Sequence, residues 1–475
     1  MKLNLPTVGP IVGFTTDNQA RIFLRGLDQR DGDGFRRCFA IVRCRIAGSP
    51  TWSAPLFNKL TFNFDFTGVI ALQGLVPNTT YEYQACWFFA DTGLDRLALF
   101  DPNIFEWPTS TDGPYDSFTT GPSDQVTQRH YAVGSCRYLL RLFEKQFGEE
   151  RGDKLFKSIL DQRAKQPLDG LVMIGDQIYA DDLNLIAPDT TIDEFLLRYR
   201  SVFSQPYLRQ LMANLPTYMI LDDHEIEDNW PKHAGKGSAT TLFTHAMYAY
   251  QIYQCSHGPL LRATPDGRID GIPDRYWYTF SDGCAAWFVM DTRTERVIAP
   301  RSGPPRIISE RQLQALLDWL SAPTPQVKMV VTSVPIFPDL RSDNDDKWGA
   351  FQQQRHIILE HIRTNAINKV VFVSGDVHCS FAGKLELRGQ KAFGVHYIVS
   401  SSFFWPLFRM QDHDFAFDVD LEGTPGQQYI PRLLSDDIYS DDNYARISVS
   451  PTEVEVNYYD RRGSRLNKKK IQLKF

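Results

Sequence analysis

The chain has 475 residues, a length typical of two or three domains. Hydrophobic residues make up 43% and charged residues 23%, the balance of a globular protein, and the formal net charge of −6 does not indicate nucleic acid as a partner. No apolar run reaches the roughly 18 residues of a membrane span. The chain opens without a basic stretch and apolar core and without a twin-arginine pair, so the sequence predicts a cytoplasmic protein.

The seven cysteines are scattered along the chain and form no Cys-x-x-Cys pair. This spacing excludes a disulfide framework and a zinc ribbon. It is typical of a reducing compartment, in which most cysteines are small buried apolar residues.

Residues 1–122 have the pattern of an all-β domain. Short apolar or alternating runs recur about every ten residues, as in a β-sandwich. The run Leu75-Val-Pro-Asn-Thr-Thr-Tyr-Glu-Tyr83 is similar to a fibronectin type III segment in which a tyrosine fixes a sandwich corner. Residues 108–125 are rich in Pro, Gly, Ser and Thr and are typical of a strand end and a linker. We therefore predict a fibronectin/Ig-like β-sandwich domain over residues 1–122.

Residues 123–475 alternate between apolar strand-like runs and helical stretches, which predicts a layered α/β domain. Ser309 and Gln312 are placed to form a capping box. The end of the chain reverts to strands, with a hairpin turn at Asp460-Arg-Arg-Gly463. The helices are expected near residues 141–164, 191–215, 309–321 and 351–367.

Five apolar runs each end in charged residues or metal-ligand residue types. Sites in open α/β sheets form outside the carboxyl ends of the strands, so these residues would converge if the strands share a sheet. A single aspartate after a strand is often only a cap or turn residue, but a series of them favours a metal site. The runs lead into Ser135-Cys136, Asp176, Asp222-Asp-His224, Asp291-Thr-Arg293 and Asp376-Val-His378.

These residue types suit the hydrolysis of phosphate esters, which resist attack because the phosphoryl group is anionic. Two metal ions ~3.5–4 Å apart neutralise this charge and lower the pKa of a bound water. Such a pair requires several carboxylates, one of them shared, and imidazole is a suitable further ligand. A neighbouring imidazolium can protonate the leaving alkoxide.

The motifs together resemble the alkaline phosphatase D (PhoD-like) family, a branch of the calcineurin-like metallophosphoesterases. The resemblance implies a calcineurin-like layered sandwich (αββα) for residues 123–475, preceded by the all-β domain. The motifs that carry it are Gly134-Ser-Cys136, Gly175-Asp-Gln-Ile-Tyr179, Tyr199–Pro206, Asp222–Trp230 and Ser374-Gly-Asp-Val-His378.

The resemblance also implies roles for individual residues. It makes His224 the proton donor, and it leaves Arg293 either to bind phosphate or to brace the carboxylates, of which the brace is favoured. Asp176 would bridge the two metals, with Cys136 and Tyr179 as thiolate and phenolate ligands of iron. The remaining implied metal ligands are Asp223, Asn229, Asp376 and His378.

The resemblance implies Fe³⁺ with Ca²⁺, with Mn²⁺, Mg²⁺ or Zn²⁺ as alternatives at the second site. Ferric iron is a hard acid, so the thiolate of Cys136 is the ligand least expected on chemical grounds. Thr332 and Ser333 stand where common metallophosphoesterases have a histidine ligand. Their presence favours an oxygen-rich second site that suits calcium or magnesium.

The predicted function is a phosphodiesterase or alkaline phosphatase that acts on a small phosphate ester, with a slight preference for diesters. Two alternatives stay open, a non-catalytic metal-stabilised binding protein and a hydrolase of another ester or anhydride class. The sequence does not define the oligomeric state. The acidic pairs Asp436-Asp437 and Asp441-Asp442 could hold calcium, but a solvated loop is favoured. Residues 400–406 either line the substrate mouth or pack in the core.

Overall fold

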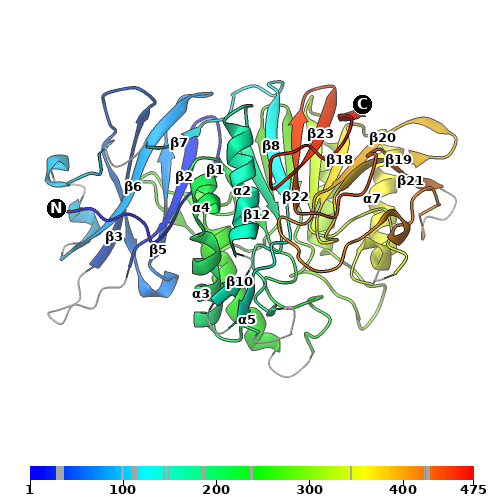
Figure 1. Cartoon of the computed structure of the whole chain (residues 1–475), viewed down its shortest axis with the longest axis horizontal. Coiled ribbons are helices and arrows are strands. Elements are labelled where there is room, and N and C mark those ends of the chain that lie inside the picture. The colour runs from blue at the N-terminus through cyan, green and yellow to red at the C-terminus, as the bar shows by residue number, and fades with distance from the viewer. Residues whose placement is uncertain are drawn as a thin grey trace.

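Two antiparallel sheets form the N-terminal end of the molecule, coloured blue in Figure 1. Buried side chains of both sheets, such as Ile22, Ile70 and Val42, form their shared core. One sheet has the order β1-β2-β5, with β1 (Val8–Thr15), β2 (Gln19–Arg25) and β5 (Thr67–Gln73). The other has the order β4-β3-β6-β7, with β3 (Arg37–Ile46), β4 (Leu56–Leu60), β6 (Thr80–Ala90) and β7 (Asp116–Thr119).

The tyrosine pattern of this region has two separate functions in the fold. The backbone N–H of Val76 donates to the Tyr81 hydroxyl at 2.9 Å, which ties the turn before β6. The Tyr83 hydroxyl instead donates to the carbonyl of Ala213, outside the two sheets, at 2.7 Å. The division of the chain at residue 122 stays a prediction.

The computed structural model places most of the chain. It describes residues 1–27, 37–91, 93–97, 101–109, 115–142, 145–147, 149–182, 188–235, 239–342, 345–421, 423 and 428–475.

Two mixed sheets make up the rest of the fold, and the predicted α/β class is confirmed. The six-stranded sheet has the order β12-β11-β8-β22-β23-β24, with β8 (Arg129–Gly134), β11 (Gly170–Ile174), β12 (Thr217–Ile220), β22 (Asn443–Val449), β23 (Glu453–Asp460) and β24 (Ile471–Lys474). The seven-stranded sheet has the order β15-β16-β17-β18-β20-β19-β21, with β15 (Tyr278–Asp282), β16 (Ala285–Val289), β17 (Val327–Thr332), β18 (Val370–Ser374), β19 (Phe381–Leu387), β20 (Gln390–Val399) and β21 (Tyr429–Leu433).

The two large sheets face each other across a common core. The rings of Tyr131 on β8 and Trp287 on β16 meet edge to face, with centroids 4.9 Å apart. Side chains alternate across a strand, so Met329 and Val331 of β17 join this core, whereas Val330 joins a second core on the opposite face. The second core includes side chains of α6 (Glu310–Ser321) and α7 (Gln352–Thr364), which cover that face.

Two of the four expected helices differ from the prediction. The helix expected from residue 141 begins at Glu149 as α2 (Glu149–Arg163), because β9 (Leu140–Leu142) and β10 (Lys145–Phe147) pair as a short hairpin before it. The helix expected over 191–215 is two helices, α3 (Ile192–Phe203) and α4 (Pro206–Ala213). Pro206 has no N–H to continue α3, so it starts a new helix instead.

The helices expected at 309–321 and 351–367 are present as α6 and α7. The predicted capping box is only half formed, because the Ser309 hydroxyl accepts the Gln312 N–H at 3.2 Å while the Gln312 amide donates to Asp291 and Glu295. Gly463 donates to the Asp460 carbonyl at 3.0 Å, as expected for a turn after β23.

The sequence patterns did not predict α5 (Ala239–Tyr250), which continues as a π-helix, η5 (Gln251–Cys255). Among the described residues, no helix combines the length and apolar character needed to cross a bilayer. All seven cysteines are buried, whereas the sequence predicted that most of them would be. The remaining short elements are α1 (Leu94–Leu97), β13 (Arg262–Ala263), β14 (Ile269–Asp270) and the 3₁₀ turns Phe62–Phe64, Pro102–Ile104, Trp348–Phe351 and Asp412–Asp414.

Candidate metal centre

The strand ends that carry the candidate ligands meet at one edge of the molecule. Strands β8, β11 and β12 are adjacent and parallel, so their carboxyl ends lie side by side. The strand before Asp376, β18, belongs to the other large sheet. The residues were expected to converge if their strands shared one sheet, whereas two facing sheets bring them together.

Several candidate ligands have a left-handed backbone, which is uncommon for residues other than glycine. Each such residue costs of the order of 1–3 kcal/mol and persists only where the surrounding structure fixes it, typically at functional sites. Just before Asp176, Gly175 has a φ of 83°, and a Cβ there would lie 2.4 Å from the Asp222 Cβ, so only glycine fits. The φ values are 56° for Cys136, 55° for Asp176, 58° for Asn229, 70° for Asp376 and 55° for His378.

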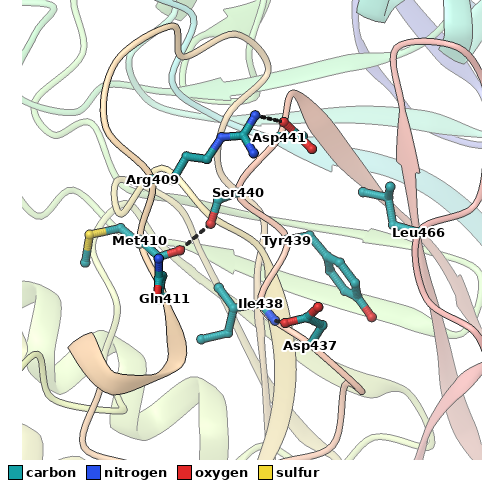
Figure 2. A pocket seen from close by; sticks show the side chains of 9 residues that line it. All are labelled: Arg409, Met410, Gln411, Asp437, Ile438, Tyr439, Ser440, Asp441 and Leu466. Atoms are coloured by element: carbon teal, nitrogen blue, oxygen red, sulfur yellow. Dashed lines mark hydrogen bonds and ion pairs between the residues drawn. The ribbon is translucent and has the colours of Figure 1, made fainter.

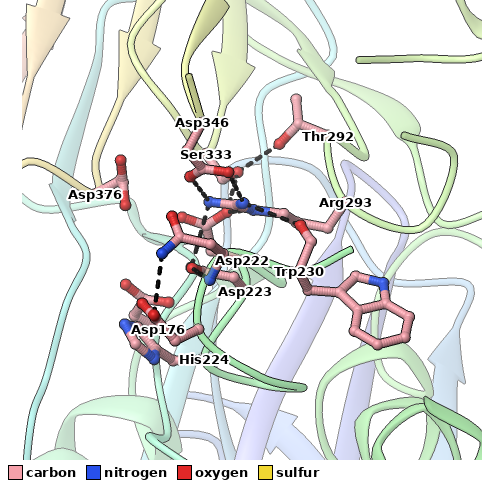
Figure 3. Close-up of polar contacts among 12 residues, drawn as sticks. Asp176, Asp222, Asp223, His224, Trp230, Thr292, Arg293, Ser333, Asp346 and Asp376 are labelled. Carbon is pink, nitrogen blue, oxygen red and sulfur yellow. Dashed lines mark hydrogen bonds and ion pairs between the residues drawn. The ribbon is translucent and has the colours of Figure 1, made fainter. Parts of the chain in front are cut away.

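Four carboxylates form the centre of the site, as Figure 3 shows. One oxygen each of Asp176, Asp222, Asp223 and Asp376 lies within 4.8 Å of the others. Burial raises the pKa of Asp176, Asp223 and Asp376, and neighbouring carboxylates raise it further. Oxygens of Asp176 and Asp222 are buried without a hydrogen-bond partner among the described residues. Such unsatisfied buried charge fits a site for metal cations.

Cys136 and Tyr179 both contact the carboxylate of Asp176. The Cys136 Sγ and the Tyr179 hydroxyl each lie 3.3 Å from Asp176 Oδ2. Burial, followed by the charge of Asp176, raises the pKa of both groups well above the usual range. Both therefore carry protons without a metal, and they would lose them on ligation, because only thiolate and phenolate bind a metal.

His224 is held by a carboxylate that the sequence analysis did not identify. Its Nδ1 lies 2.9 Å from Asp181 Oδ2, and its ring stacks on Tyr179 with centroids 4.2 Å apart. Burial lowers the pKa of His224, but the charges of Asp181, Asp223 and Asp176 outweigh it, so the net pKa lies well above 6.5. These neighbouring carboxylates favour the imidazolium form of the side chain.

Arg293 is a brace between carboxylates. Its guanidinium bonds Asp222, donates to both oxygens of Asp346 at 2.7 and 2.9 Å and lies 3.3 Å from Asp223 Oδ1. It also donates to the Trp230 carbonyl at 3.2 Å. The side chain is fully buried and does not line the cavity described below. This geometry favours the bracing role over phosphate binding.

Lys347 is a second cation at the site that the sequence did not reveal. Its ammonium pairs with Asp376 and lies 3.2 Å from Asp346 Oδ2. Burial lowers the pKa of Lys347, but these two carboxylates raise it above its usual range, so it is charged. Unlike Arg293, Lys347 lines the cavity.

Glu225 organises the backbone beneath the ligands. Its carboxylate accepts the N–H groups of Asp176, Gln177 and Asp222 at 3.0, 2.8 and 2.8 Å. Burial raises the pKa of Glu225 to about 7 in spite of these bonds. The residue was visible in the sequence as part of the Asp-Asp-His-Glu run, but it received no role there.

His378 and Asn229 lie on the cavity wall rather than in the carboxylate cluster. The His378 ring stacks on Trp405 at a centroid distance of 3.5 Å, and burial lowers its pKa well below 6.5, so it is neutral as a metal ligand requires. The Asn229 backbone N–H donates to Asp223 at 2.6 Å. Its side-chain amide donates to Asp228 at 3.0 Å.

A cavity of about 290 Å³ opens onto the ligands. Its outer rim is apolar, with Phe408 64% and Leu407 46% exposed. Trp405 lines the cavity, whereas Ser400 and Ser401 are fully buried. The segment 400–406 therefore contributes to both the core and the mouth. The hydroxyl of Ser333 donates to Asp222 at 2.6 Å, so it supports a carboxylate outside the cavity.

A second depression adjoins this mouth and shares Met410 with it (Figure 2). Asp441, one of the residues considered for calcium, pairs there with Arg409. Asp437 is not among the described acidic residues that cluster at the candidate metal centre. Both partners of the Arg409–Asp441 pair are more than half exposed. Asp436, Asp437 and Asp441 are thus solvated as expected, whereas Asp442 is only 3% exposed and lies 3.4 Å from Arg461.

Comparison with known proteins identifies the family of this chain. A model of the PhoD-like phosphatase family matches residues 147–456. The chain belongs to the PhoD-like phosphatase family. Alkaline phosphatase D of Bacillus subtilis (strain 168) is 26% identical over 325 residues, which cover 59% of this chain and 52% of that protein. The match thus spans about half the length of this curated relative.

The fold of this PhoD-like chain is also shared. A solved structure of PhoD superposes with a TM-score of 0.69 over 98% of this chain and 89% of that chain, at 20% identity. A predicted phosphoesterase from Streptococcus pneumoniae TIGR4 gives a TM-score of only 0.25 at 7% identity over 74% of this chain and 99% of that chain, too low to support an argument.

Proposed function

We propose that this PhoD-like protein is a metal-dependent phosphoric ester hydrolase that prefers small phosphodiesters. The observation that carries the proposal is the buried carboxylate cluster of Asp176, Asp223 and Asp376 beside His224, which Asp181 orients on the cavity wall. The family membership supports phosphoester hydrolysis in general.

The donors fit two metals of different character. We assign Fe³⁺ to Cys136 and Tyr179, with Asp176 shared, because the phenol and thiol both contact the Asp176 carboxylate. We assign Ca²⁺, or alternatively Mn²⁺, Mg²⁺ or Zn²⁺, to Asp223 with Asn229, and Asp376 and His378 complete the set. When bound, the ions would supply positive charge and would lower the pKa of a bound water, so that a nucleophile is available at neutral pH.

The residues around the metals then define the rest of the chemistry. Asp181 fixes the Nδ1–H of His224, which leaves the other ring nitrogen to protonate the departing ester oxygen. Lys347 adds a positive charge on the cavity wall for the phosphoryl oxygens. The apolar rim of Leu407 and Phe408 suits an organic substituent on the phosphate, which favours a diester.

We further propose that residues 1–122 form the fibronectin/Ig-like domain and that residues 123–475 form a calcineurin-like αββα sandwich. The antiparallel sheets at the N-terminal end and the two facing mixed sheets with outer helices support this division.

Two other functions give different expectations. In a non-catalytic metal-stabilised protein, nothing requires a proton donor on the cavity wall, whereas here Asp181 orients His224 there. A hydrolase of another ester or anhydride class would use the same residues on a different electrophile.

The deciding experiment is hydrolysis of bis-p-nitrophenyl phosphate by the protein loaded with iron and a divalent ion. Wild-type activity should fall at least about a hundredfold in His224→Ala, whereas the exposed-histidine variant His413→Ala should keep it. If the metal-loaded wild type leaves this diester intact but hydrolyses carboxylic esters or anhydrides, the protein is a hydrolase of another ester or anhydride class. Inactivity on all of them would favour the binding protein.

A further inference from the structure

A larger cavity lies away from the metal centre, where the N-terminal sheets meet the rest of the fold. Its volume is about 400 Å³, within the range of small-molecule sites. One wall comes from β4, β5 and the turn before β5, and the other from the end of α5, η5 and residues 261–273. It shares no lining residue with the cavity at the metal centre.

The lining of this cavity combines apolar side chains, some neutral polar ones and a single cation, Lys59. Val69 and Ile252 form its floor and are each 4% exposed, and Phe64 and Ile272 stand at its rim with 60% and 86% exposed. Lys59 also lines it, forms no ion pair within the described part of the chain, and has no acidic side chain beside it in the lining. An apolar molecule with one negative charge matches this combination.

The two walls are locked together before any ligand binds. Asp65, only 4% exposed, accepts bonds from Arg25 of β2 at 3.0 and 3.1 Å and from Arg200 of α3 at 2.7 Å. The Tyr253 hydroxyl of η5 donates to the same carboxylate. A ligand would therefore enter a formed cavity without a large ordering cost.

The wall formed by η5 also contacts the support of the metal centre. Gln251, Ile252 and Cys255 line the cavity, whereas Gln254 of the same π-helical turn donates to Glu225 at 3.0 Å. Glu225 in turn holds the backbone N–H groups of Asp176 and Asp222. π-Helical turns are rare and occur frequently at functional sites.

We propose that this cavity binds a small apolar anion of the medium-chain carboxylate type and that η5 transmits its occupancy to the metal centre through Gln254 and Glu225. Because Tyr253 fixes η5 to Asp65, a ligand that contacts Ile252 shifts this helical turn slightly and as a unit, rather than moving one side chain. The same turn carries Gln254, so the position of Glu225 and of the backbone it holds shifts with it. By linkage, metal and anion then change each other's affinity by the same factor.

The binding test uses octanoate and isothermal titration calorimetry on the full chain. We expect a dissociation constant of the order of 0.1–1 mM for a ligand of this size. Lys59→Gln should weaken binding roughly tenfold through loss of the cation, and Ile252→Trp should abolish it by filling the cavity. Lys474→Gln, at an exposed position on β24, is the charge-matched control and should bind as the wild type does.

Two results would contradict the proposal that this cavity binds an apolar anion. They are no heat of binding at 5 mM octanoate, or an equal affinity for octanoate in the wild type and Lys59→Gln. Lys59 is exposed, so this variant remains informative if Ile252→Trp fails to fold. Octanoate binding does not require hydrolysis, so failure of the proposed function leaves this test intact.

The transmission is tested by titrating Mn²⁺ into the metal-free protein with and without saturating octanoate. We expect at least a threefold change in Mn²⁺ affinity in the wild type and none in Ile252→Trp. Octanoate that binds without changing the Mn²⁺ affinity would overturn the transmission. Hydrolysis of the diester with and without octanoate gives a second readout, in which kcat should change only when the cavity is intact.

Discussion

The Nδ1 of His224 and the Oδ2 of Asp181 lie 2.9 Å apart, and both side chains are buried. A carboxylate in this position sets the ring orientation and keeps the proton on Nδ1. The Asp228 backbone N–H, 2.8 Å from the same oxygen, holds Asp181 in place. Asp181 is thus a positioning residue for the proposed proton donor.

Asp181→Asn should reduce kcat for diester hydrolysis by about ten- to a hundredfold, because the imidazolium loses its orienting charge. The loss should be larger for a phenyl ester than for a p-nitrophenyl ester, since the poorer leaving group depends more on protonation. Steady-state kinetics with both esters measure this difference. An equal loss on both substrates would show that Asp181 acts on folding or metal binding instead.

Lys347→Gln should strengthen metal binding and weaken substrate binding. Asp376 loses its ammonium partner, so affinity for the divalent ion should rise severalfold, while KM for the diester should rise about tenfold through loss of positive charge at the phosphoryl group. Metal titration and steady-state kinetics measure the two effects. Lys232→Gln, a half-exposed lysine paired with Asp345, is the control, and both quantities should stay unchanged in it. A fall in metal affinity in Lys347→Gln would contradict the assignment.

Arg293→Met should lower the free energy of unfolding by about 3–5 kcal/mol, because Asp222, Asp223 and Asp346 would keep buried charge without the guanidinium. Chemical denaturation of the metal-free protein measures it. The comparison variant Arg311→Met breaks an exposed pair with Asp274 and should cost less than about 1 kcal/mol. Equal stability of the two variants would argue against Arg293 as the brace.

His257 should make the fold acid-sensitive. It is 1% exposed, its Nδ1 has no hydrogen-bond partner among the described residues, and burial lowers its pKa from 6.5 to about 4. The unfolded chain takes up a proton below pH 6.5 while the folded chain does not, so stability falls as pH decreases from about 6.5 to about 4, by about 3 kcal/mol for this group.

The measurement is the free energy of unfolding at pH 7.5 and pH 4.5 for the wild type and His257→Gln. The difference between the two pH values should be smaller in the variant. It should not vanish, because burial also lowers the pKa of His130 and His396 to about 4. An undiminished difference would assign the acid sensitivity to other groups.

Several candidate ligands could be identified from the sequence because they stand within two residues of a strand end. Cys136, Asp176 and Asp376 each come directly after a short apolar run or its terminal glycine or serine, and such local patterns predict a strand and the edge at which it ends. The helix ends were harder to predict from the sequence. The start of α2 is set by the β9–β10 hairpin just before it. The break between α3 and α4 is set by a single proline, Pro206.

The tertiary structure alone decided how these ligands are supported. Asp181 and Lys347 stand in polar stretches whose sequence resembles that of any solvated loop, and Glu225 stands in a motif that does not show its role. Their function follows from burial against groups far away in the chain, as Lys347 against Asp376 and Glu225 against the backbone of Asp176. The sequence determined which ligand types follow which strands, because that is a local property. Which charges lose their water, and which partners replace it, was decided only when the two sheets packed face to face.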